Sequence, residues 1–459
     1  MKVTQRIEYF FEKYLPSPLT IAVLLTLLTM VLAIFFTKPE STSLSSYSLE
    51  VLGYWQQGIW SNNLLVFAYQ MMLILVLGHV LVLRKPASNL ILKITKYCND
   101  TASSAAIVIV ATMLVSFFNW GLGLIFGALL ARKVAEHAQQ NNIPLNYPIV
   151  GAAGYIGFLV WHGGISGSAP IKINEDGHLL SLMKSVSSEK ILTQLPQNIR
   201  YSDTVFSSWN LIIFFTVLIT VAFTFYFLGK KANPTIINLP NYEMNKEIKI
   251  TTNAEKLDAS KWIAYFFGGV IFISFIYVYR LDILQLKITP NLINFFMLGL
   301  GLILHGSIQK FSNAVGEAIS DISGILIQFP LYFGIMSIMN TSGMVGLIAN
   351  FFVSISNPTT LPIFTFFSAG LVNIFVPSGG GQWVVQGPIV VESALTLGVP
   401  LPKAIMALAY GDQVTNMLQP FWALPLLGIT KLKAREILPY TLIAMVVGSM
   451  VYLLGLIIF

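Results

Sequence analysis

The sequence predicts an all-α, polytopic membrane protein with about nine transmembrane helices and two re-entrant hairpins, arranged as an inverted repeat. Three observations support this prediction. Of the 459 residues, 55% are hydrophobic and only 10% are charged, and several apolar windows of roughly 20 residues can cross a bilayer. Two apolar segments contain polar, glycine-rich breaks. The same order of elements also occurs twice along the chain.

The net charge of +7 comes from basic residues that cluster in short loops beside the apolar segments. On a soluble domain this excess would suggest nucleic acid, but here it follows the rule that cytoplasmic loops are rich in Lys and Arg. We therefore expect the lipid bilayer as a partner and no nucleic acid. Cys98 is the only cysteine, which excludes an internal disulfide.

The first predicted span covers residues 18–36. Basic residues precede it and no small-residue cleavage site is present, so we expect a retained helix with a cytoplasmic N-terminus. A polar loop follows and ends at an interfacial Trp60, and a second span at 64–83 returns to the cytoplasm. The basic residues at these cytoplasmic ends are Lys2, Arg6, Lys13, Arg84 and Lys85.

The apolar segment 102–131 is predicted to be a re-entrant hairpin, because basic residues flank both of its ends. A single crossing would place the two basic residues that follow it outside, against the charge rule. Its middle reads Phe-Asn119-Trp-Gly121-Leu-Gly123, a polar break that is tolerated at membrane depth only inside protein or beside a wet cavity. Two arms of about 15 residues reach roughly the midplane.

From Tyr147 the chain is expected to cross outward, to form a long external loop at 166–202 and to return at 209–228. The polar stretch 230–261 is the most linker-like part of the chain. Residues 262–279 then form one additional crossing.

The second half repeats the element order of the first. Gly121-Leu-Gly123 corresponds to Gly379-Gly-Gly381 at a separation of 258 residues. Because one additional crossing separates the halves, the second copy starts on the opposite face, as in inverted-repeat transporters. The predicted parts are a first repeat at 1–229 with its hairpin at about 102–131, a cytoplasmic linker and connecting helix at 230–290, and a second repeat at 291–459 with its hairpin at about 361–398.

The turn Asn373-Ile-Phe-Val-Pro-Ser378-Gly-Gly-Gly-Gln382-Trp interrupts the second hairpin. Pro377 cannot extend the incoming helix, and three successive glycines give the helical backbone no side-chain support. The N–H groups at the start of the outgoing helix carry partial positive charge and can hold an anion. This turn is therefore the best candidate substrate site in the chain.

The run from Asn373 to Pro388, together with Tyr410-Gly-Asp-Gln-Val-Thr-Asn-Met-Leu-Gln-Pro420, resembles the bacterial short-chain fatty acid transporter family, which includes the acetoacetate/butyrate permeases. The resemblance covers essentially the whole chain. It implies ion-coupled carboxylate transport by paired re-entrant hairpins, often in a homodimer with elevator-like motion. It also implies short monocarboxylate substrates.

A carboxylate near the membrane midplane needs hydrogen-bond donors without a large charge, and the hairpin turns supply them. The alternative is that glycine-rich turns only let helices pack closely, and His162 is equally expected as a packed or solvated interfacial histidine. The predicted substrate-binding residues are Asn119, Gly121, Gly123, His162, Ser378, Gly379, Gly380, Gly381, Gln382, Gln386 and Asn416.

Asp412 is the only acid between Pro402 and Lys431, in a segment that otherwise has the composition of a span. An intramembrane acid costs roughly 3 kcal/mol and suggests a function. We expect Asp412 to carry a coupling proton or to help a Na⁺ site; the alternative is an interfacial acid bonded to a neighbour. The predicted coupling-ion residues are Asp412, Thr415, Asn373 and Glu392, and Glu392 is alternatively a wetted residue near the outside.

We expect secondary transport of short-chain fatty acids, coupled to H⁺ or Na⁺, and no enzyme. The chain has neither a Gly-x-x-x-x-Gly-Lys phosphate loop nor His-x-x-x-His zinc spacing, so we expect no metal site and no cofactor beyond Na⁺ as a coupling ion. Alternatives are a related dicarboxylate or aminobenzoyl-type anion, or a passive facilitator. A dicarboxylate would require an Arg in the hairpins or broken spans, where we expect none.

Overall fold

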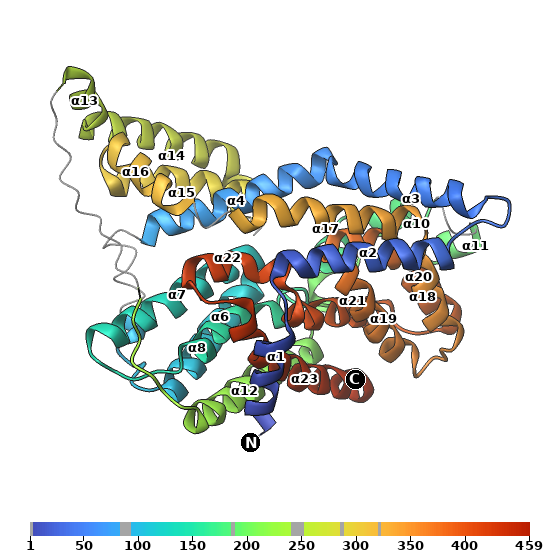
Figure 1. Cartoon of the computed structure of the whole chain (residues 1–459). Helices are drawn as coiled ribbons and strands as arrows, with labels where there is room; N and C mark the ends of the chain where they lie inside the picture. The colour runs from blue at the N-terminus through green and yellow to red at the C-terminus, as the bar shows by residue number, and fades with distance from the viewer. Residues whose placement is uncertain (1–2, 83–92, 185–188, 240–251, 285–288, 320–322) are drawn as a thin grey trace.

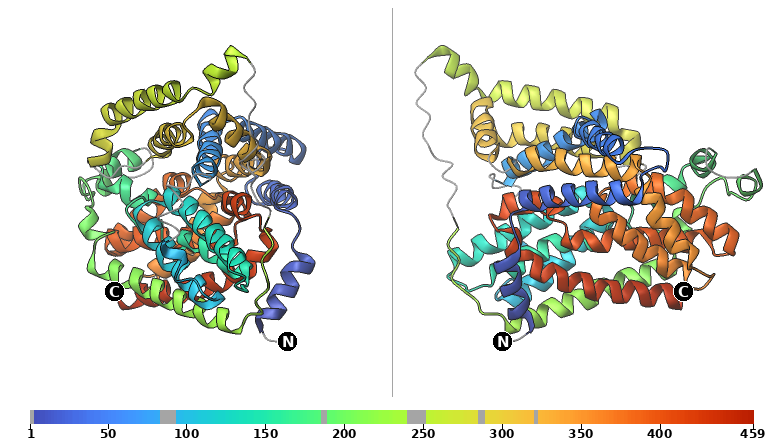
Figure 2. Two further views of the ribbon diagram at one scale, coloured as in Figure 1. Left: turned by 90° about the vertical axis from the view of Figure 1, so that its left-hand side faces the viewer. Right: turned by 45° about the vertical axis from the view of Figure 1, so that its right-hand side comes forward.

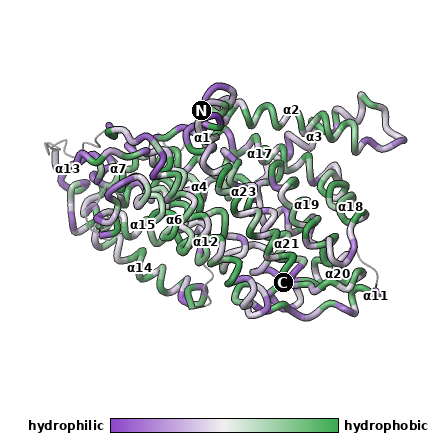
Figure 3. Tube along the Cα trace, turned by 90° about the horizontal axis from the view of Figure 1, so that it is seen from below, coloured by the Kyte–Doolittle hydropathy of each residue, from purple (hydrophilic) through white to green (hydrophobic). Residues whose placement is uncertain are grey.

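The computed structural model describes residues 3–82, 93–184, 189–239, 252–284, 289–319 and 323–459. These residues are mostly helical, and within them the recorded β-bridge joins Leu145 to Thr235. The long helices run side by side in Figure 1, with the short α1 (Val3–Tyr14) lying across them. Figure 3 shows apolar residues along these helices and hydrophilic residues near the ends of the bundle, as around α13 (Asn253–Asp258). The predicted all-helical polytopic class is confirmed.

Six helices of the described chain are long and apolar enough to cross a membrane, and four of them coincide with the spans predicted at 18–36, 64–83, 209–228 and 262–279. The six are α2 (Pro18–Phe36), α4 (Asn62–Val82), α6 (Thr101–Phe118), α12 (Ser208–Lys231), α14 (Lys261–Leu284) and α23 (Ala434–Ile458). A bent pair, α17 (Ser323–Thr341) and α18 (Met344–Ser354), adds a seventh if it forms one span. Shorter helices α15 (Pro290–His305) and α16 (Ile308–Ala318) lie beside them. The total of nine spans stays a prediction.

The polar loop predicted after the first span is largely a helix, α3 (Leu44–Ile59). Ser43 caps this helix by accepting a hydrogen bond from the Ser46 N–H. Tyr47, Val51 and Gly58 are buried and lie on one face at helical spacing. A Cβ on Gly58 would lie 2.5 Å from the Phe333 carbonyl oxygen, so α3 and α17 pack backbone to backbone. Because the segment is polar in composition, its sequence did not indicate this buried helix face.

The segment of the first predicted hairpin forms two helices, α6 and α7 (Trp120–Gln140), which are joined at Asn119. Because α6 is itself long enough to cross a membrane, the re-entrant character of this segment stays a prediction. Its second arm continues to Gln140 and not only to about 131. Arg132 therefore lies within α7, just beyond the predicted end of the hairpin. Its side chain is 3% exposed and pairs with Glu136 at 2.9 Å, roughly 18 Å along the helix from the tip. It is thus remote from the tip.

The second hairpin consists of α19 (Leu361–Phe375) and α20 (Gly379–Leu397), in agreement with the predicted range of 361–398. The two hairpins approach from opposite ends of the bundle, with α6 and α7 on the left of Figure 1 and α19 and α20 on the right. The same opposed arrangement is visible in the right-hand view of Figure 2. This opposition is what an inverted repeat requires, although the repeat and its boundaries stay a prediction.

Two broken helical segments lie next to the hairpins. One is α8 (Tyr147–Tyr155), followed by the short helix η1 (Ile156–Leu159) and an irregular stretch through His162. The other is α21 (Leu401–Thr415), followed by η4 (Asn416–Leu418) and α22 (Pro420–Thr430). The α-helix ends at Thr415, and Gln419 is extended before Pro420, which has no N–H and begins α22. These breaks bring irregular backbone to the centre of the molecule.

The described part of the loop predicted at 166–202 contains short helices, of which α9 (Ser168–Asn174) and α10 (His178–Met183) pack against the second hairpin. Ala169, Ile173 and Leu179 are buried in one apolar cluster with Trp383 and Val390 of α20. The described parts of the loop therefore cover this hairpin. The other short helices of this segment are α11 (Glu189–Leu192) and η2 (Tyr201–Asp203).

His178 connects this loop to the hairpin through a hydrogen bond. Trp383 Nε1 donates to His178 Nε2 at 3.0 Å, which requires an unprotonated Nε2. Burial lowers the pKa of His178 and the charge of Lys172 lowers it further, while Glu175 acts in the opposite direction. The neutral ring that the hydrogen bond needs is thus favoured.

Candidate substrate and ion site

A cavity of about 250 Å³ lies between the tips of the two hairpins. Ser168 and residues 377–380 of the second tip supply its polar and backbone groups. The rest of its wall is apolar and mostly aromatic. The remaining lining residues are Leu64, Phe67, Trp120, Phe158, Trp161, Phe333, Met336, Phe421 and Trp422.

The tip of the second hairpin presents backbone donors to this cavity. Ser378 caps α20 by accepting a hydrogen bond from the Gly381 N–H at 3.2 Å, and its own hydroxyl proton stays able to donate. The N–H groups of Gly379 and Gly380 occupy the first two helical positions, where no partner exists within the helix. They carry the positive end of the helix dipole. Gly379, Gly380 and Ser378 therefore form an uncharged anion cradle.

The tip of the first hairpin contributes an aromatic ring to the cavity and does not form a second cradle. Asn119 is buried, and its Oδ1 accepts from the Leu122 N–H at 2.9 Å. A Cβ on Gly123 would lie 2.0 Å from Ser116 Oγ, so close packing accounts for that glycine. Gly121 lies beside Asn119 and α15 without such a close contact. Only Trp120 of this tip lines the cavity.

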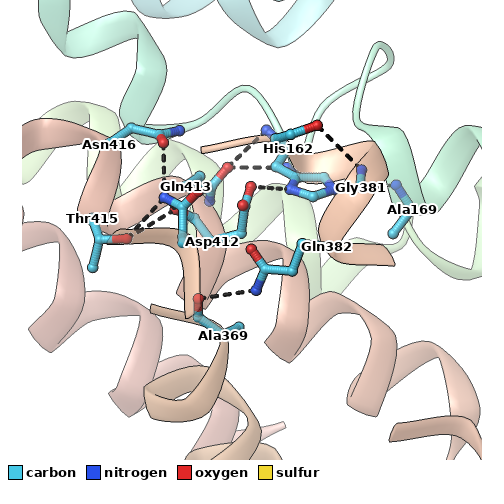
Figure 4. A network of polar contacts seen from close by, with 12 residues as sticks. His162, Ala169, Ala369, Gly381, Gln382, Asp412, Gln413, Thr415 and Asn416 are labelled. Atoms are coloured by element: carbon cyan, nitrogen blue, oxygen red, sulfur yellow. Dashed lines mark hydrogen bonds and ion pairs between the residues drawn. The ribbon is translucent and has the colours of Figure 1, made fainter. Parts of the chain in front are cut away.

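His162 and Asp412 form a fully buried pair behind the second tip (Figure 4). His162 Nδ1 lies 2.5 Å from Asp412 Oδ2, and Nε2 accepts a hydrogen bond from the Ala169 N–H at 3.1 Å. Because Nε2 accepts, the ring proton of a neutral imidazole must be on Nδ1 and points at the carboxylate. Asp412 Oδ1 has no hydrogen-bond partner among the described residues.

The hairpin tip touches this pair directly. A Cβ on Gly379 would lie 2.8 Å from His162 Cε1 and 2.8 Å from Trp161 Cη2. Only a residue without a side chain permits this approach. The glycine at the start of α20 therefore brings the hairpin tip into contact with the His162 ring.

The residues predicted to handle a coupling ion converge around Asp412, with one exception. Asn373 Nδ2 donates to the Asp412 carbonyl at 2.6 Å and to Asn416 Oδ1 at 2.8 Å, and it lies 2.9 Å from Thr415 Oγ1. These oxygen atoms are the ligand type that Na⁺ prefers, but the Asn373 amide occupies the space between them. Glu392 lies roughly 20 Å further along α20 from the tip and is not brought to this cluster.

Two predicted substrate ligands point into the hairpin and not into the cavity. Gln382 Nε2 donates to the Ala369 carbonyl at 2.9 Å and to Gln386 Oε1 at 2.8 Å. Gln386 Nε2 in turn donates to Ser368 Oγ at 2.8 Å. Both side chains are buried and join the two arms. They rigidify the hairpin that carries the cradle.

Sequence reasoning missed Gln413, which positions the backbone on either side of the pair. Its Oε1 accepts hydrogen bonds from the N–H groups of His162 at 2.9 Å and Gly163 at 3.1 Å. Tyr155 acts similarly, since its hydroxyl donates to the Asn416 carbonyl at 2.7 Å. The position of Gln413 next to the intramembrane Asp412 was the available signal. No local pattern linked either residue to a segment about 250 positions away.

The comparisons with known proteins identify the family of this chain. The profile of the family described as "Short chain fatty acid transporter" matches residues 1–459. The chain belongs to this family. A protein of Escherichia coli (strain K12), provisionally named a short-chain fatty acid transporter, is 35% identical and covers 100% of this chain and 99% of its own length. A protein of Haemophilus influenzae with the same provisional name is also 35% identical, over 99% of both chains. The expected family is thereby confirmed, and this membership implies a transporter.

Two solved structures align with nearly the whole chain. MtrF of Neisseria gonorrhoeae is described as one of a class of antimetabolite efflux pumps. It is 15% identical with a TM-score of 0.41, and the match covers 98% of this chain and 97% of MtrF. The YdaH transporter of Alcanivorax borkumensis is 14% identical with a TM-score of 0.42 and covers 96% and 98%. These TM-scores are low, and we draw no conclusion about this chain from either structure.

Proposed function

We propose that the protein is a secondary active transporter of short monocarboxylates, such as acetoacetate or butyrate, across a bacterial inner membrane, driven by H⁺ or Na⁺. The observation that supports this best is the cavity between the hairpin tips. It joins the uncharged anion cradle of Ser378, Gly379 and Gly380 to an apolar wall. A short fatty acid has the same two parts, a carboxylate and a hydrocarbon tail.

In this proposal the carboxylate accepts hydrogen bonds from the Gly379 and Gly380 N–H groups and from the Ser378 hydroxyl. The tail then contacts the aromatic wall, where each buried CH₂ group contributes about 0.8 kcal/mol. The lining residues include no Lys or Arg, so a second carboxylate would be buried there without a charged partner. This disfavours the dicarboxylate alternative.

Coupling follows from the buried charge beside the cradle. Like charges repel more strongly in a buried site than in water, because the effective dielectric constant is lower there. An anionic Asp412 therefore opposes a substrate carboxylate at Gly379. A proton on Asp412 Oδ1, or a Na⁺ ion near Thr415 and Asn416, removes this repulsion. By reciprocity, the substrate then strengthens binding of the ion by the same factor.

For the transport step we propose elevator-like movement of the two hairpins and the broken segments against the remaining helices. The opposed hairpins, whose tips meet at the cavity, support this division (Figures 1 and 2). The cytoplasmic N-terminus and a homodimeric assembly, both expected from the sequence, belong to the same proposal. Site-directed crosslinking across the hairpin and helix α4 in membranes would test the movement.

Uptake of labelled butyrate into proteoliposomes tests the substrate site. We expect Gly380→Leu to abolish uptake, because a Leu side chain would enter the cavity, and Ser378→Ala to reduce it. If both variants took up butyrate at the wild-type rate, the site would be wrong. Uptake that only equilibrates, without response to an imposed Na⁺ or pH gradient, would instead support a passive facilitator.

A further inference from the structure

The cavity is larger than a four-carbon acid needs. An apolar cavity of about 150 Å³ accepts benzene, which has as many non-hydrogen atoms as butyrate. At the same volume per atom, the nine such atoms of benzoate need about 225 Å³. The cavity of about 250 Å³ exceeds the volume needed by either acid, but only benzoate would nearly fill it.

The wall of the cavity is built from rings, with Trp422 at its centre. The Trp422 ring lies 5.5 Å from Trp120, 5.3 Å from Phe158, 6.0 Å from Phe67 and 5.0 Å from Phe421, measured between centroids. The contacts with Trp120, Phe67 and Phe421 are edge-on, with interplanar angles of 72°, 78° and 83°. Flat faces and edges at these angles suit a further ring in offset or edge-to-face contact.

The donors of the hairpin tip lie at one end of the cavity. They are the Gly379 and Gly380 N–H groups and the hydroxyls of Ser378 and Ser168, all at or beside the tip. One carboxylate is therefore accommodated there. The opposite part of a ligand meets a mainly aromatic wall, whose polar groups are indole N–H donors such as Trp161 Nε1, which has no hydrogen-bond partner among the described residues. A planar ring that carries a single carboxylate matches both parts of the cavity.

We propose that the cavity also accepts single-ring aromatic monocarboxylates of the benzoate class, and that Trp422 is the residue that selects for a flat tail. This inference rests on the proposed transport function, because it uses the same cradle. It extends the substrate range from short aliphatic acids to aryl acids. Cyclohexanecarboxylate is the matched comparison, since it has the same atom count and charge but a puckered ring.

The test is competition for labelled butyrate uptake in proteoliposomes, with protein-free liposomes subtracted because neutral acids cross lipid unaided. We expect benzoate to inhibit uptake, and cyclohexanecarboxylate to inhibit with roughly 2- to 10-fold lower apparent affinity, the range expected from an aromatic pair. Quenching of tryptophan fluorescence by benzoate gives a second readout that needs no transport. Butyrate uptake that hundredfold excess benzoate leaves unchanged, with no quenching, would overturn the inference while the proposed function stands.

Trp422→Leu should lower the benzoate-to-butyrate preference about 5-fold, and Trp422→Phe, the smaller perturbation of packing, should keep most of it. The matched control is Trp262→Leu, since Trp262 is 84% exposed on α14 and should leave both acids unaffected. An unchanged preference in both Trp422 variants would refute the role of Trp422. Absence of any carboxylate uptake or binding by the wild type would refute the proposed function as well.

Discussion

Replacing Gly379 by Ala tests whether the hairpin tip must touch the His162 pair. The added Cβ would lie 2.8 Å from both His162 Cε1 and Trp161 Cη2. His162 cannot swing away freely, because Asp412 holds one ring nitrogen at 2.5 Å and the Ala169 N–H holds the other at 3.1 Å. Overpacking of this kind costs typically 1–3 kcal/mol. The docked tip, meaning the conformation in which Gly379 contacts the His162 ring, should therefore become about 5- to 150-fold less populated.

The assay is initial butyrate uptake at limiting substrate, where the rate follows the population of the docked tip. We expect at least about a tenfold loss for G379A. Gly269→Ala is the matched control, because no atom lies within 4 Å of its added Cβ on α14. Gly380→Ala is the graded comparison, with Ser168 Oγ as its nearest neighbour at 3.9 Å, and should lose less activity. Wild-type uptake by G379A would refute the close approach of tip and pair.

Three further predictions concern the surroundings of the site. Gln413→Leu leaves two buried N–H groups unpaired, at about 1–3 kcal/mol each, and should lower the melting temperature in detergent. Gln413→Glu keeps an acceptor and should lower the melting temperature less. Equal losses in the two variants would contradict the positioning role of Gln413. The lowered pKa of His178 means that the unfolded chain binds more protons, so stability should fall as the pH drops just below about 6.5. His178→Gln should be less sensitive to this drop, because its amide oxygen can still accept from Trp383; an identical pH profile would contradict this prediction. Burial raises the pKa of Cys98 to about 11. Maleimide should therefore label the native protein much more slowly than the denatured protein at pH 7.5. Equal labelling rates would contradict the burial of this thiol.

Elements with a strong local signal were predictable from the sequence. The helices at Pro18–Phe36, Ser208–Lys231 and Lys261–Leu284 match their predicted spans within a few residues because each is a continuous apolar run. The second hairpin was located by Pro377 and the glycines, whose backbone effects do not depend on the rest of the fold. α3 was missed because its buried face consists of few residues in a polar segment.

Side-chain partners were far less predictable than the segments that carry them. Asp412 and His162 were both selected, but their contact joins residues 250 positions apart, and neither sequence window identifies the other. Gln382 and Gln386 lie beside the glycine turn as expected, yet their orientation depends on acceptors on α19. The rings of the cavity come from several separate elements, and each one alone has the composition of ordinary membrane core.

In the proposed mechanism, substrate binding at the hairpin tip is coupled to a cation at Asp412. The most direct test is butyrate accumulation in proteoliposomes under separately imposed pH and Na⁺ gradients, with wild type and Asp412→Asn compared. We expect wild-type protein to accumulate butyrate above equilibrium under one gradient. Asp412→Asn removes the buried charge and should equilibrate butyrate without accumulation. Accumulation by the variant equal to that of the wild type, or indifference of the wild type to both gradients, would contradict the coupling mechanism.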